Sequence, residues 1–179
     1  MPVQLVTIGA SIGGLEGLRE LLANLPRDFP PATAVVQHRG AGDFATLLPW
    51  LTAHVQLPLV EVQDKEEIKS GYVYLAPPDY HLLAEDGHFA LSADLPVMDS
   101  RPSIDILFES AAEAFRDNLI GVLLTGTGLD GLAGLAKIKQ FGGYTIVQDG
   151  ITAEHDSMLP LSEIAPCLAR LCMGQGSFV

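Results

Sequence analysis

Apolar residues along the chain repeat with two periods, one typical of strands and the other of helices. Short β-rich runs predict strands at residues 4–8, 33–37, 59–62, 119–124 and 144–147. Longer segments with helical spacing predict helices at residues 14–25, 43–55, 103–115, 131–141 and 161–171. Pro49 is expected to bend or shorten the second helix, and Pro166 to interrupt the last. This alternation predicts an α/β fold in which a doubly wound, mostly parallel sheet carries helices on both faces.

The middle of the chain follows a different pattern. Short apolar runs predict strands at residues 72–76, 80–84 and 89–92. Residues 85–88 have the composition of a hairpin turn, so we expect a short antiparallel hairpin at an edge of the sheet. Further along, Ser103 is the predicted N-cap of the next helix. Asp105 lies in the first turn of that helix, where a negative charge is favourable to the helix dipole.

The composition describes a chain that can bury a core. Of the 179 residues, 48% are hydrophobic and 18% are charged, and no linker or repeat divides them. We therefore predict a single domain over residues 1–179. Ten Lys and Arg against 22 Asp and Glu give a formal charge of -12. Such a field repels nucleic acid and anionic lipid surfaces, so neutral, basic or polar partners fit the chain better than polyanions do.

Signals for a membrane, secreted or metal-binding protein are weak or missing in this sequence. No apolar run approaches the ~18 residues of a membrane span. The first apolar run, residues 3–10, leads into a glycine turn and does not resemble a signal peptide. Cys167 and Cys172 are expected to be reduced thiols, and the adjacent Glu-His-Asp of residues 154–156 seldom converges on one metal ion. We expect a cytoplasmic protein without metal, cofactor, nucleic-acid partner or direct membrane insertion.

A serine in a glycine-rich turn follows the first strand. Residues 9–13 read Gly-Ala-Ser-Ile-Gly and match the G-x-S-x-G nucleophile elbow, at the strand-to-helix junction where that motif occurs. Small residues around Ser11 suit a tight turn, and Gly13 and Gly14 let backbone N–H groups approach an oxyanion. Two alternatives stay open: an anion-binding turn and a purely structural turn. The first is weakened because Ser11 stands where G-x-G-x-x-G requires glycine.

A serine nucleophile needs a general base, and the chain has five histidines. His38 directly follows the second predicted strand, at the same edge of the sheet as the serine. His54 and His88 fall in a predicted helix end and a hairpin turn, where solvated histidine is the ordinary case. His81 and His155 stay as alternative bases, the former in an apolar stretch and the latter in a charged loop. His38 is the preferred candidate.

An aspartate at a third strand end completes the candidate site. Asp130 lies between the strand at residues 119–124 and the following helix, at the edge where Ser11 and His38 are expected. A carboxylate there can hold the imidazole in the required tautomer and stabilise its charged form. The alternative is that Asp130 caps the helix that begins at Gly131. The two roles can coexist.

Six segments together resemble the catalytic domain of the chemotaxis receptor protein-glutamate methylesterase family. They are IGASIGG (8–14), VVQHR (35–39), SGYVYLAPPDYHL (70–82), RPSIDILFESAA (101–112), GVLLTGTGLDG (121–131) and GGYTIVQD (142–149). Each segment is a modest signal alone, whereas all six in this order are strongly specific. The similarity runs from Val6 to about Gln148 and continues more loosely to the C-terminus.

The resemblance implies a doubly wound α/β domain that hydrolyses glutamyl methyl esters on chemoreceptor cytoplasmic helices and releases methanol. It also implies that glutamine there can be deamidated. The family triad falls on Ser11, His38 and Asp130. From the same resemblance we place oxyanion donors and substrate contacts near Ile12, Gly13, Thr127, Arg39 and Met158. The implied partner is the cytoplasmic domain of a methylated chemoreceptor.

Three departures from the family pattern lie near the expected reaction centre. Ile12 stands where the family often has threonine or alanine, and Thr127 replaces the usual methionine. Residues 157–160 replace a G-M-P segment within residues 151–160, which we predict to be a loop. Backbone donors can survive the first two changes, so rate and substrate fit are affected more than chemistry. With LAPPDYH and KIKQFGG, Thr127 looks like the branch fused to methyltransferase and sensor modules.

The receiver domain that usually precedes this domain in the family is not found in the 179 residues. We therefore expect regulation to come from a separate receiver or a fused signalling module. Two other functions remain as alternatives. A catalytically weak regulatory or interaction module of the same fold is favoured by Ile12, Thr127 and the altered tail. A small-molecule esterase on the same scaffold is the second alternative, and a buried, closed cavity at Ser11 would favour it.

Overall fold

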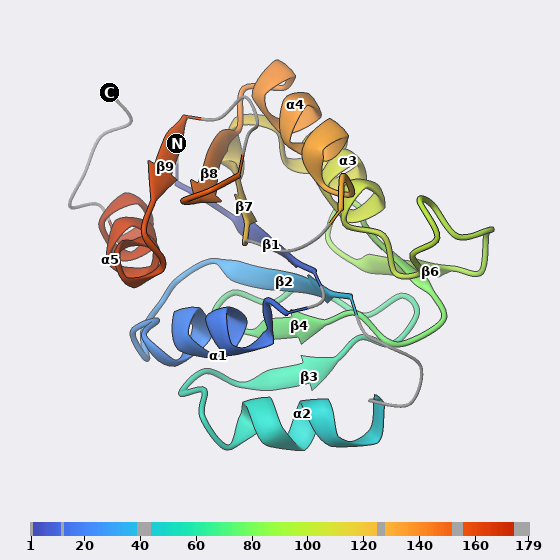
Figure 1. Cartoon of the computed structure of the whole chain (residues 1–179), viewed down its shortest axis with the longest axis horizontal. Helices are drawn as coiled ribbons and strands as arrows, with labels where there is room; N and C mark the ends of the chain where they lie inside the picture. Colours follow the sequence, from blue (N-terminus) through green and yellow to red (C-terminus); the bar gives the residue numbers. More distant parts are fainter. Residues whose placement is uncertain (1, 12, 39–43, 125–127, 152–155, 174–179) are drawn as a thin grey trace.

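The computed structural model has a central parallel sheet with helices on both sides (Figure 1). It describes residues 2–11, 13–38, 44–124, 128–151 and 156–173. The strand order is β3-β4-β2-β1-β7-β8-β9, with every pairing parallel. The strands are β1 (Leu5–Ala10), β2 (Ala32–Gln37), β3 (Leu59–Glu61), β4 (Val73–Leu75), β7 (Leu119–Leu123), β8 (Tyr144–Gln148) and β9 (Ser157–Leu159). The expected parallel α/β sheet is confirmed.

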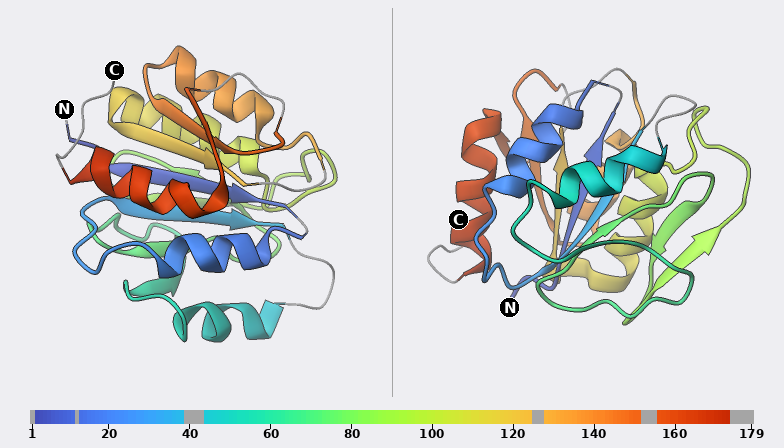
Figure 2. Two further views of the ribbon diagram at one scale, coloured as in Figure 1. Left: turned by 60° about the vertical axis from the view of Figure 1, so that its left-hand side comes forward. Right: turned by 90° about the horizontal axis from the view of Figure 1, so that it is seen from below.

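Helices cover both faces of this sheet, as Figure 2 shows. One face carries α1 (Leu15–Ala23), α2 (Phe44–Thr52) and α5 (Leu161–Cys172). The other face carries α3 (Ile104–Phe115) and α4 (Leu132–Gln140). Two separate hydrophobic cores result because successive strand residues point to opposite faces. In β1, Leu5 is buried in the core under α3 and α4, whereas Val6 and Ile8 are buried in the core under α1, α2 and α5.

The predicted hairpin forms, but not at the edge of the main sheet. Strands β5 (His81–Ala84) and β6 (Phe89–Ser92) pair antiparallel as a separate two-stranded sheet. Leu82 and Phe89 are buried in the same core as α3, so the hairpin packs on the layer of that helix. Ala84 N also donates to Ser110 Oγ of α3 at 3.1 Å. The remaining predicted strand of this region, residues 72–76, contains β4, which is a parallel strand of the main sheet.

The segment predicted as a loop at residues 151–160 contains strand β9, and this corrects the prediction. β9 pairs parallel with β8. Asp156, directly before it, accepts hydrogen bonds from the N–H and hydroxyl of Thr145 at 2.8 and 2.9 Å. Lys139 Nζ lies 3.0 Å from the same carboxylate. Polar contacts fix this short strand, which is why no apolar period marks it in the sequence.

Both prolines that were expected to disturb helices lie inside continuous ones. Pro166 does not interrupt α5, which runs unbroken through it. Pro49 lies inside α2, which is shorter than the helix predicted over residues 43–55. Both side chains are on the exposed side of their helices, where water can satisfy a carbonyl that proline leaves without an N–H partner.

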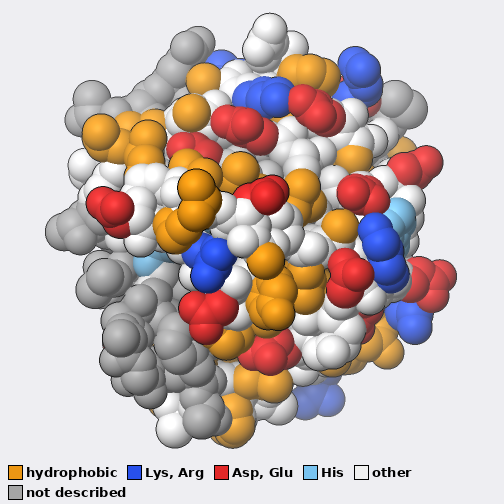
Figure 3. All heavy atoms as spheres, turned by 90° about the vertical axis from the view of Figure 1, so that its right-hand side faces the viewer, with side chains coloured by type: hydrophobic (Ala, Val, Ile, Leu, Met, Phe, Trp, Pro, Cys, Tyr) orange, Lys and Arg blue, Asp and Glu red, His pale blue; other side chains and the backbone are white. Residues whose placement is uncertain are grey.

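Charged and apolar side chains are interspersed on the face of the molecule seen from the right of Figure 1. On this face basic side chains do not gather into a patch among the residues described (Figure 3). Leu95, Met98 and Leu129 are among the large apolar side chains that are exposed to solvent. Within the described part of the chain, no helix combines the length and the apolar character that crossing a membrane requires.

Close packing of α4 on α3 depends on a glycine. A Cβ added to Gly134 would lie 2.4 Å from Phe108 Cβ and 3.2 Å from Asp105 Oδ1. The first distance is shorter than real carbon contacts, so any side chain at this position forces the two helices apart. The helices must stay close because, as shown below, their N-termini exchange hydrogen bonds.

We expect Gly134→Ala to lower the free energy of unfolding by about 1–3 kcal/mol through overpacking. The matched control is Gly17→Ala in α1, where the nearest atom to an added Cβ is an ordinary 3.5 Å away. That change should be neutral or stabilise by up to about 1 kcal/mol, because alanine favours helix. Urea unfolding of the two variants measures the difference. Equal stabilities would show that the helix contact can relax.

Candidate active site

Three neighbouring strands deliver the candidate residues to one edge of the sheet. β1 lies between β2 and β7, and all three run parallel. Ser11 follows β1, His38 follows β2, and Asp130 lies in the segment between β7 and α4. Ala10 is in register with the last residue of β2, and His38 N donates to Ala10 O at 2.8 Å. Ser11 and His38 therefore leave the sheet side by side, as expected from the sequence.

The turn after β1 has the geometry that its glycines suggest. Gly13 has a φ of +92°, in the region that favours glycine, and no atom lies within 4 Å of a Cβ built there. The requirement at Gly13 is therefore one of backbone conformation and not of space. Gly14 N donates to Ser11 O at 2.9 Å and is followed directly by α1. Ser11 itself is only 9% exposed, at the mouth of this tight turn.

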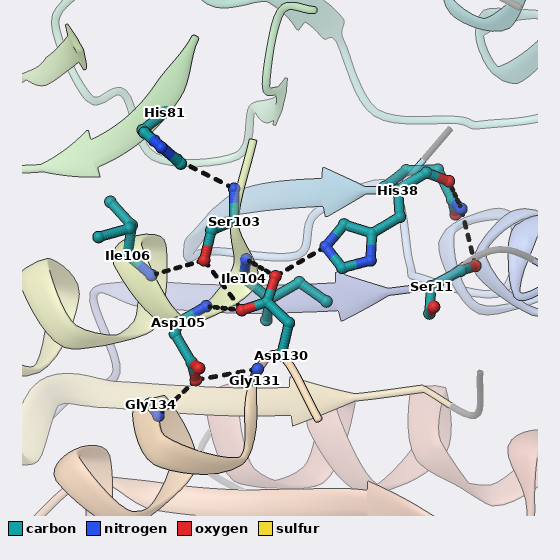
Figure 4. Close-up of polar contacts among 11 residues, drawn as sticks. Ser11, His38, His81, Ser103, Ile104, Asp105, Ile106, Asp130, Gly131 and Gly134 are labelled. Carbon is teal, nitrogen blue, oxygen red and sulfur yellow. Dashed lines mark hydrogen bonds and ion pairs between the residues drawn. The ribbon is translucent and has the colours of Figure 1, made fainter. Parts of the chain in front are cut away.

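His38 and Asp130 form a buried hydrogen-bonded pair. His38 Nε2 lies 2.7 Å from Asp130 Oδ2, and the two side chains are 11% and 4% exposed. In Figure 4 the imidazole ring lies between Asp130 and Ser11. Because a carboxylate only accepts hydrogen bonds, neutral His38 must carry its proton on Nε2. Its other nitrogen, Nδ1, then holds the lone pair that a general base needs.

The carboxylate of Asp130 also binds the N-terminus of α3. Oδ2 accepts from Ile104 N at 2.7 Å, and Oδ1 accepts from Asp105 N at 2.8 Å and Ser103 Oγ at 2.9 Å. These donors belong to the first turn and the N-cap of α3. Together with His38 they give Asp130 four hydrogen-bond donors. Ser103 is the N-cap, as predicted, and accepts from Ile106 N at 3.4 Å.

Asp105 returns the exchange by capping α4. Its Oδ1 accepts from Gly131 N at 2.9 Å and Gly134 N at 2.7 Å. The sequence had suggested Asp130 as the cap of α4 and the charge of Asp105 as favourable to its own helix. Instead, each carboxylate binds the N-terminus of the other helix. Asp130 therefore does not cap α4, whereas Asp105 lies in the first turn of α3 as predicted and also caps α4.

Burial and hydrogen bonds act in opposite directions on these two carboxyl groups. Burial raises the pKa of Asp130, but hydrogen bonds from His38, from the N–H groups of Asp105 and Ile104, and from Ser103 bring it below the ordinary 3.8. For Asp105, burial raises the pKa and the Gly134 N–H lowers it, and the charge of Asp130 helps to keep it above 3.8. Asp130 therefore holds its negative charge more firmly than its neighbour does.

His81, an alternative base in the sequence, is hydrogen-bonded to Ser103, which in turn is hydrogen-bonded to Asp130. It is 1% exposed, its Nδ1 accepts from Ser103 N at 3.2 Å and its Nε2 lies 3.0 Å from Leu95 O. Both ring nitrogens are thus engaged within the protein, and Figure 4 shows the contact with Ser103, the N-cap residue of α3. His81 does not occupy the place of His38. The other alternative, His155, lies outside the described residues.

Ile12, Arg39 and Thr127, the predicted oxyanion and substrate contacts, also lie outside the described residues. Met158 is in β9 and is 42% exposed. Three strand spacings of about 4.8 Å separate β9 from β1, so Met158 is on the order of 14 Å away across the sheet. A contact there would require a substrate that extends over the strand ends.

Neither a metal centre nor a reactive thiol is found in the part of the chain described. Those residues contain no group of three or more His, Cys, Asp and Glu side chains placed to hold a metal ion. Cys167 and Cys172 are free, as expected, and are in α5. Burial and then the neighbouring Cys167 raise the pKa of Cys172 to about 12, which makes it a poor nucleophile.

Sequence reasoning missed the residues that surround Asp130. His81 and the exchanged role of Asp105 carry no separate motif, because a buried histidine or a first-turn aspartate is common in any α/β protein. The sequence contains one indication of this arrangement. Asp105 and Asp130 both stand at the start of a helix, and Asp130 is also the predicted partner of His38. The reciprocal arrangement follows only from the three-dimensional contact of α3 with α4.

The sequence is similar to those of known esterases. A family model described as CheB methylesterase matches residues 6–171. A relative from Leptospira interrogans is 46% identical over 165 residues, covering 92% of this chain and 85% of that protein. An Anaeromyxobacter dehalogenans protein named protein-glutamate methylesterase/protein-glutamine glutaminase 2 is 40% identical over 182 residues, covering 94% of this chain and 53% of its own. The chain thus spans about half the length of that second relative.

A solved structure agrees with the sequence similarity. The crystal structure of the Thermotoga maritima CheB methylesterase catalytic domain matches with a TM-score of 0.87 and 34% identity, covering 96% of this chain and 100% of that one. The strand order and the helices on both faces are therefore those of a solved catalytic domain. With the family model spanning most of the sequence, the chain belongs to the CheB methylesterase family.

Proposed function

We propose that this chain is a serine hydrolase that removes methyl groups from glutamyl methyl esters on chemoreceptor cytoplasmic helices. Ser11 is the nucleophile, His38 the general base and Asp130 the residue that orients the base. The observation that carries the proposal is the buried hydrogen bond from His38 Nε2 to Asp130 Oδ2, at the strand end next to Ser11. Membership in the CheB methylesterase family supports the substrate class.

The reaction has two halves that use the same residues. Asp130 keeps the His38 proton on Nε2, so Nδ1 takes the proton of Ser11 as its Oγ attacks the ester carbonyl. Backbone N–H groups near Ile12, Gly13 and Thr127 stabilise the oxyanion. The imidazolium then protonates the leaving methoxide, and methanol departs. Water, deprotonated by His38, hydrolyses the acyl-enzyme and leaves a glutamate carboxylate with Ser11 regenerated.

The same acyl-enzyme allows a second reaction. The carbonyl of a glutamine amide can be attacked in the same way, and the His38 imidazolium then protonates the amide nitrogen, so that ammonia departs. Relatives named protein-glutamate methylesterase/protein-glutamine glutaminase carry both activities in their names. We therefore include deamidation of receptor glutamines in the proposal.

The glutamyl side chain of the proposed substrate projects from a long helix, so we propose that it binds in a shallow groove across the strand ends. Arg39 and Met158 are proposed to line the rim of this groove.

We propose that residues 1–179 form one domain and that a separate receiver or a fused signalling module regulates it. The receptor's cytoplasmic helices place the reaction in the cytoplasm. The formal charge of -12 is compatible with a partner surface that is neutral or basic.

Replacing the nucleophile tests the proposal most directly. Ser11→Ala should abolish methanol release from a methylated receptor and leave receptor binding nearly intact, because the hydroxyl contributes bond making and little ground-state contact. Ser162→Ala, which changes an exposed serine of α5, is the control and should behave as wild type. Equal release by wild type and Ser11→Ala would remove Ser11 as the nucleophile. No release from either would favour the catalytically weak module.

Asp130→Asn should reduce turnover severely, by up to about 10^4-fold by analogy with other triads, because asparagine favours the wrong imidazole tautomer. Methanol release at saturating receptor measures this loss. A variant with a wild-type rate would show that His38 needs no carboxylate.

The same variant should change how stability depends on pH. The pKa of Asp130 is below 3.8 in the folded chain, so its ionised form contributes stability above that pH, and the contribution is lost as pH falls through the folded value. Asparagine has no such contribution to lose. The stability gap between wild type and Asp130→Asn should therefore narrow from about pH 6 to about pH 3 in urea unfolding. A constant gap would contradict the lowered pKa.

A further inference from the structure

A buried glutamine links the proposed nucleophile to the proposed base. Gln37 is the last residue of β2 and is 3% exposed. Its Nε2 donates to Ser11 O at 2.9 Å and to His38 O at 2.8 Å. Both hydrogens of one amide are therefore used on the main chain of the two residues that must react together.

The orientation of this amide follows from its partners. Carbonyl oxygens only accept hydrogen bonds, so the nitrogen of Gln37 must face Ser11 and His38. A flipped amide would bring Oε1 against two other oxygens and lose both bonds. The arrangement thus has one stable state, with the two carbonyls held at a fixed separation.

The side-chain amide of Gln37 lies where the backbone hydrogen bonds between β1 and β2 end. β1 ends at Ala10 and β2 at Gln37, and one further backbone hydrogen bond runs from His38 N to Ala10 O at 2.8 Å. Beyond this point Ser11 turns toward α1, held by Gly14 N on Ser11 O at 2.9 Å. The side chain of Gln37 adds a connection between the two segments just past the ladder.

The other end of the Gln37 amide, the buried Oε1, has no hydrogen-bond partner in the described part of the chain. An unpaired buried acceptor is destabilising, and an apolar residue of the same size would avoid the penalty. Such a residue would also lose both donors.

We propose that Gln37 is a positioning residue for the reaction. Its amide clamps the carbonyls of Ser11 and His38 and so fixes the distance between the serine hydroxyl and the imidazole. Catalysis is sensitive to such distances because proton transfer and attack require near-contact geometry. The inference rests on the proposed function of Ser11 and His38, and it adds no contact between Gln37 and the substrate.

Two substitutions at this position remove the clamp in different ways. Gln37→Met keeps the length of the side chain but has no donor. Gln37→Glu keeps its shape and presents oxygens to both carbonyls. We expect kcat for methanol release to fall about 10- to 100-fold in each, with KM within about 2-fold of wild type. Labelling of Ser11 by a fluorophosphonate probe should slow in parallel.

The control is Thr33→Val, on the same strand and distant from the site. Thr33 is fully buried and its Oγ1 also has no partner within the described structure, so the change removes a comparable polar group. Its kcat and labelling rate should match wild type. All rates are taken per folded molecule, with the folded fraction measured by circular dichroism, so that a loss of fold is not counted as a loss of positioning.

Several results would overturn the inference. Wild-type kcat and labelling in both Gln37 variants would show that the clamp does not position the site. A rise in KM alone would show a substrate contact, and unfolding of both variants would show a purely structural role. Ser11→Ala, measured alongside, separates the two proposals. If it still releases methanol, the proposed function fails; if it is inactive while the Gln37 variants are normal, only the clamp fails.

Discussion

The carboxylate of Asp130 serves a helix end and an imidazole at once, and the rest of the site depends on that sharing. Hydrogen bonds from His38 and from backbone N–H groups of α3 lower the pKa of the carboxylate in a place where burial alone would raise it. The ionised carboxylate has no proton to donate, so it fixes the His38 proton on Nε2. Asp105 binds the N-terminus of α4 and so holds this helix against α3, and the missing side chain of Gly134 allows the two helices to approach closely. The packing of these helices and the charge of Asp130 therefore depend on one connected set of contacts.

The order of the strands explains how residues far apart in sequence meet. The chain starts in the middle of the sheet with β1, places β2, β3 and β4 on one side, with β4 between β2 and β3, and then returns to place β7 on the other side. The ends of β1 and β7 meet at the point where the direction of strand addition reverses, which is where open α/β sheets place their ligands. Ser11, His38 and the segment that holds Asp130 follow the three central strands.

Much of this could be predicted from the sequence because its causes are local or periodic. Apolar periods predicted most strands and helices, and the parallel sheet placed Ser11, His38 and Asp130 at one edge. The remainder depends on contacts between distant segments. Residue preferences placed the charge of Asp105 in the first turn of its own helix and offered Asp130 as a cap of the next, but they did not indicate that each carboxylate would bind the N-terminus of the other helix. Polar contacts of Asp156 fix β9, and the layer on which the hairpin packs depends on α3, so no pattern within those segments predicted either.

The double role of Asp130 has a consequence for how members of such a family diverge. A lineage that no longer needs hydrolysis can replace the proposed nucleophile Ser11 without removing the carboxylate that binds α3. Replacing Asp130 would also remove the hydrogen bonds to the first turn of α3. Selection for a folded protein therefore acts against this replacement whether or not the protein still hydrolyses esters. An aspartate kept at this position in a descendant therefore indicates an intact scaffold and does not by itself indicate activity.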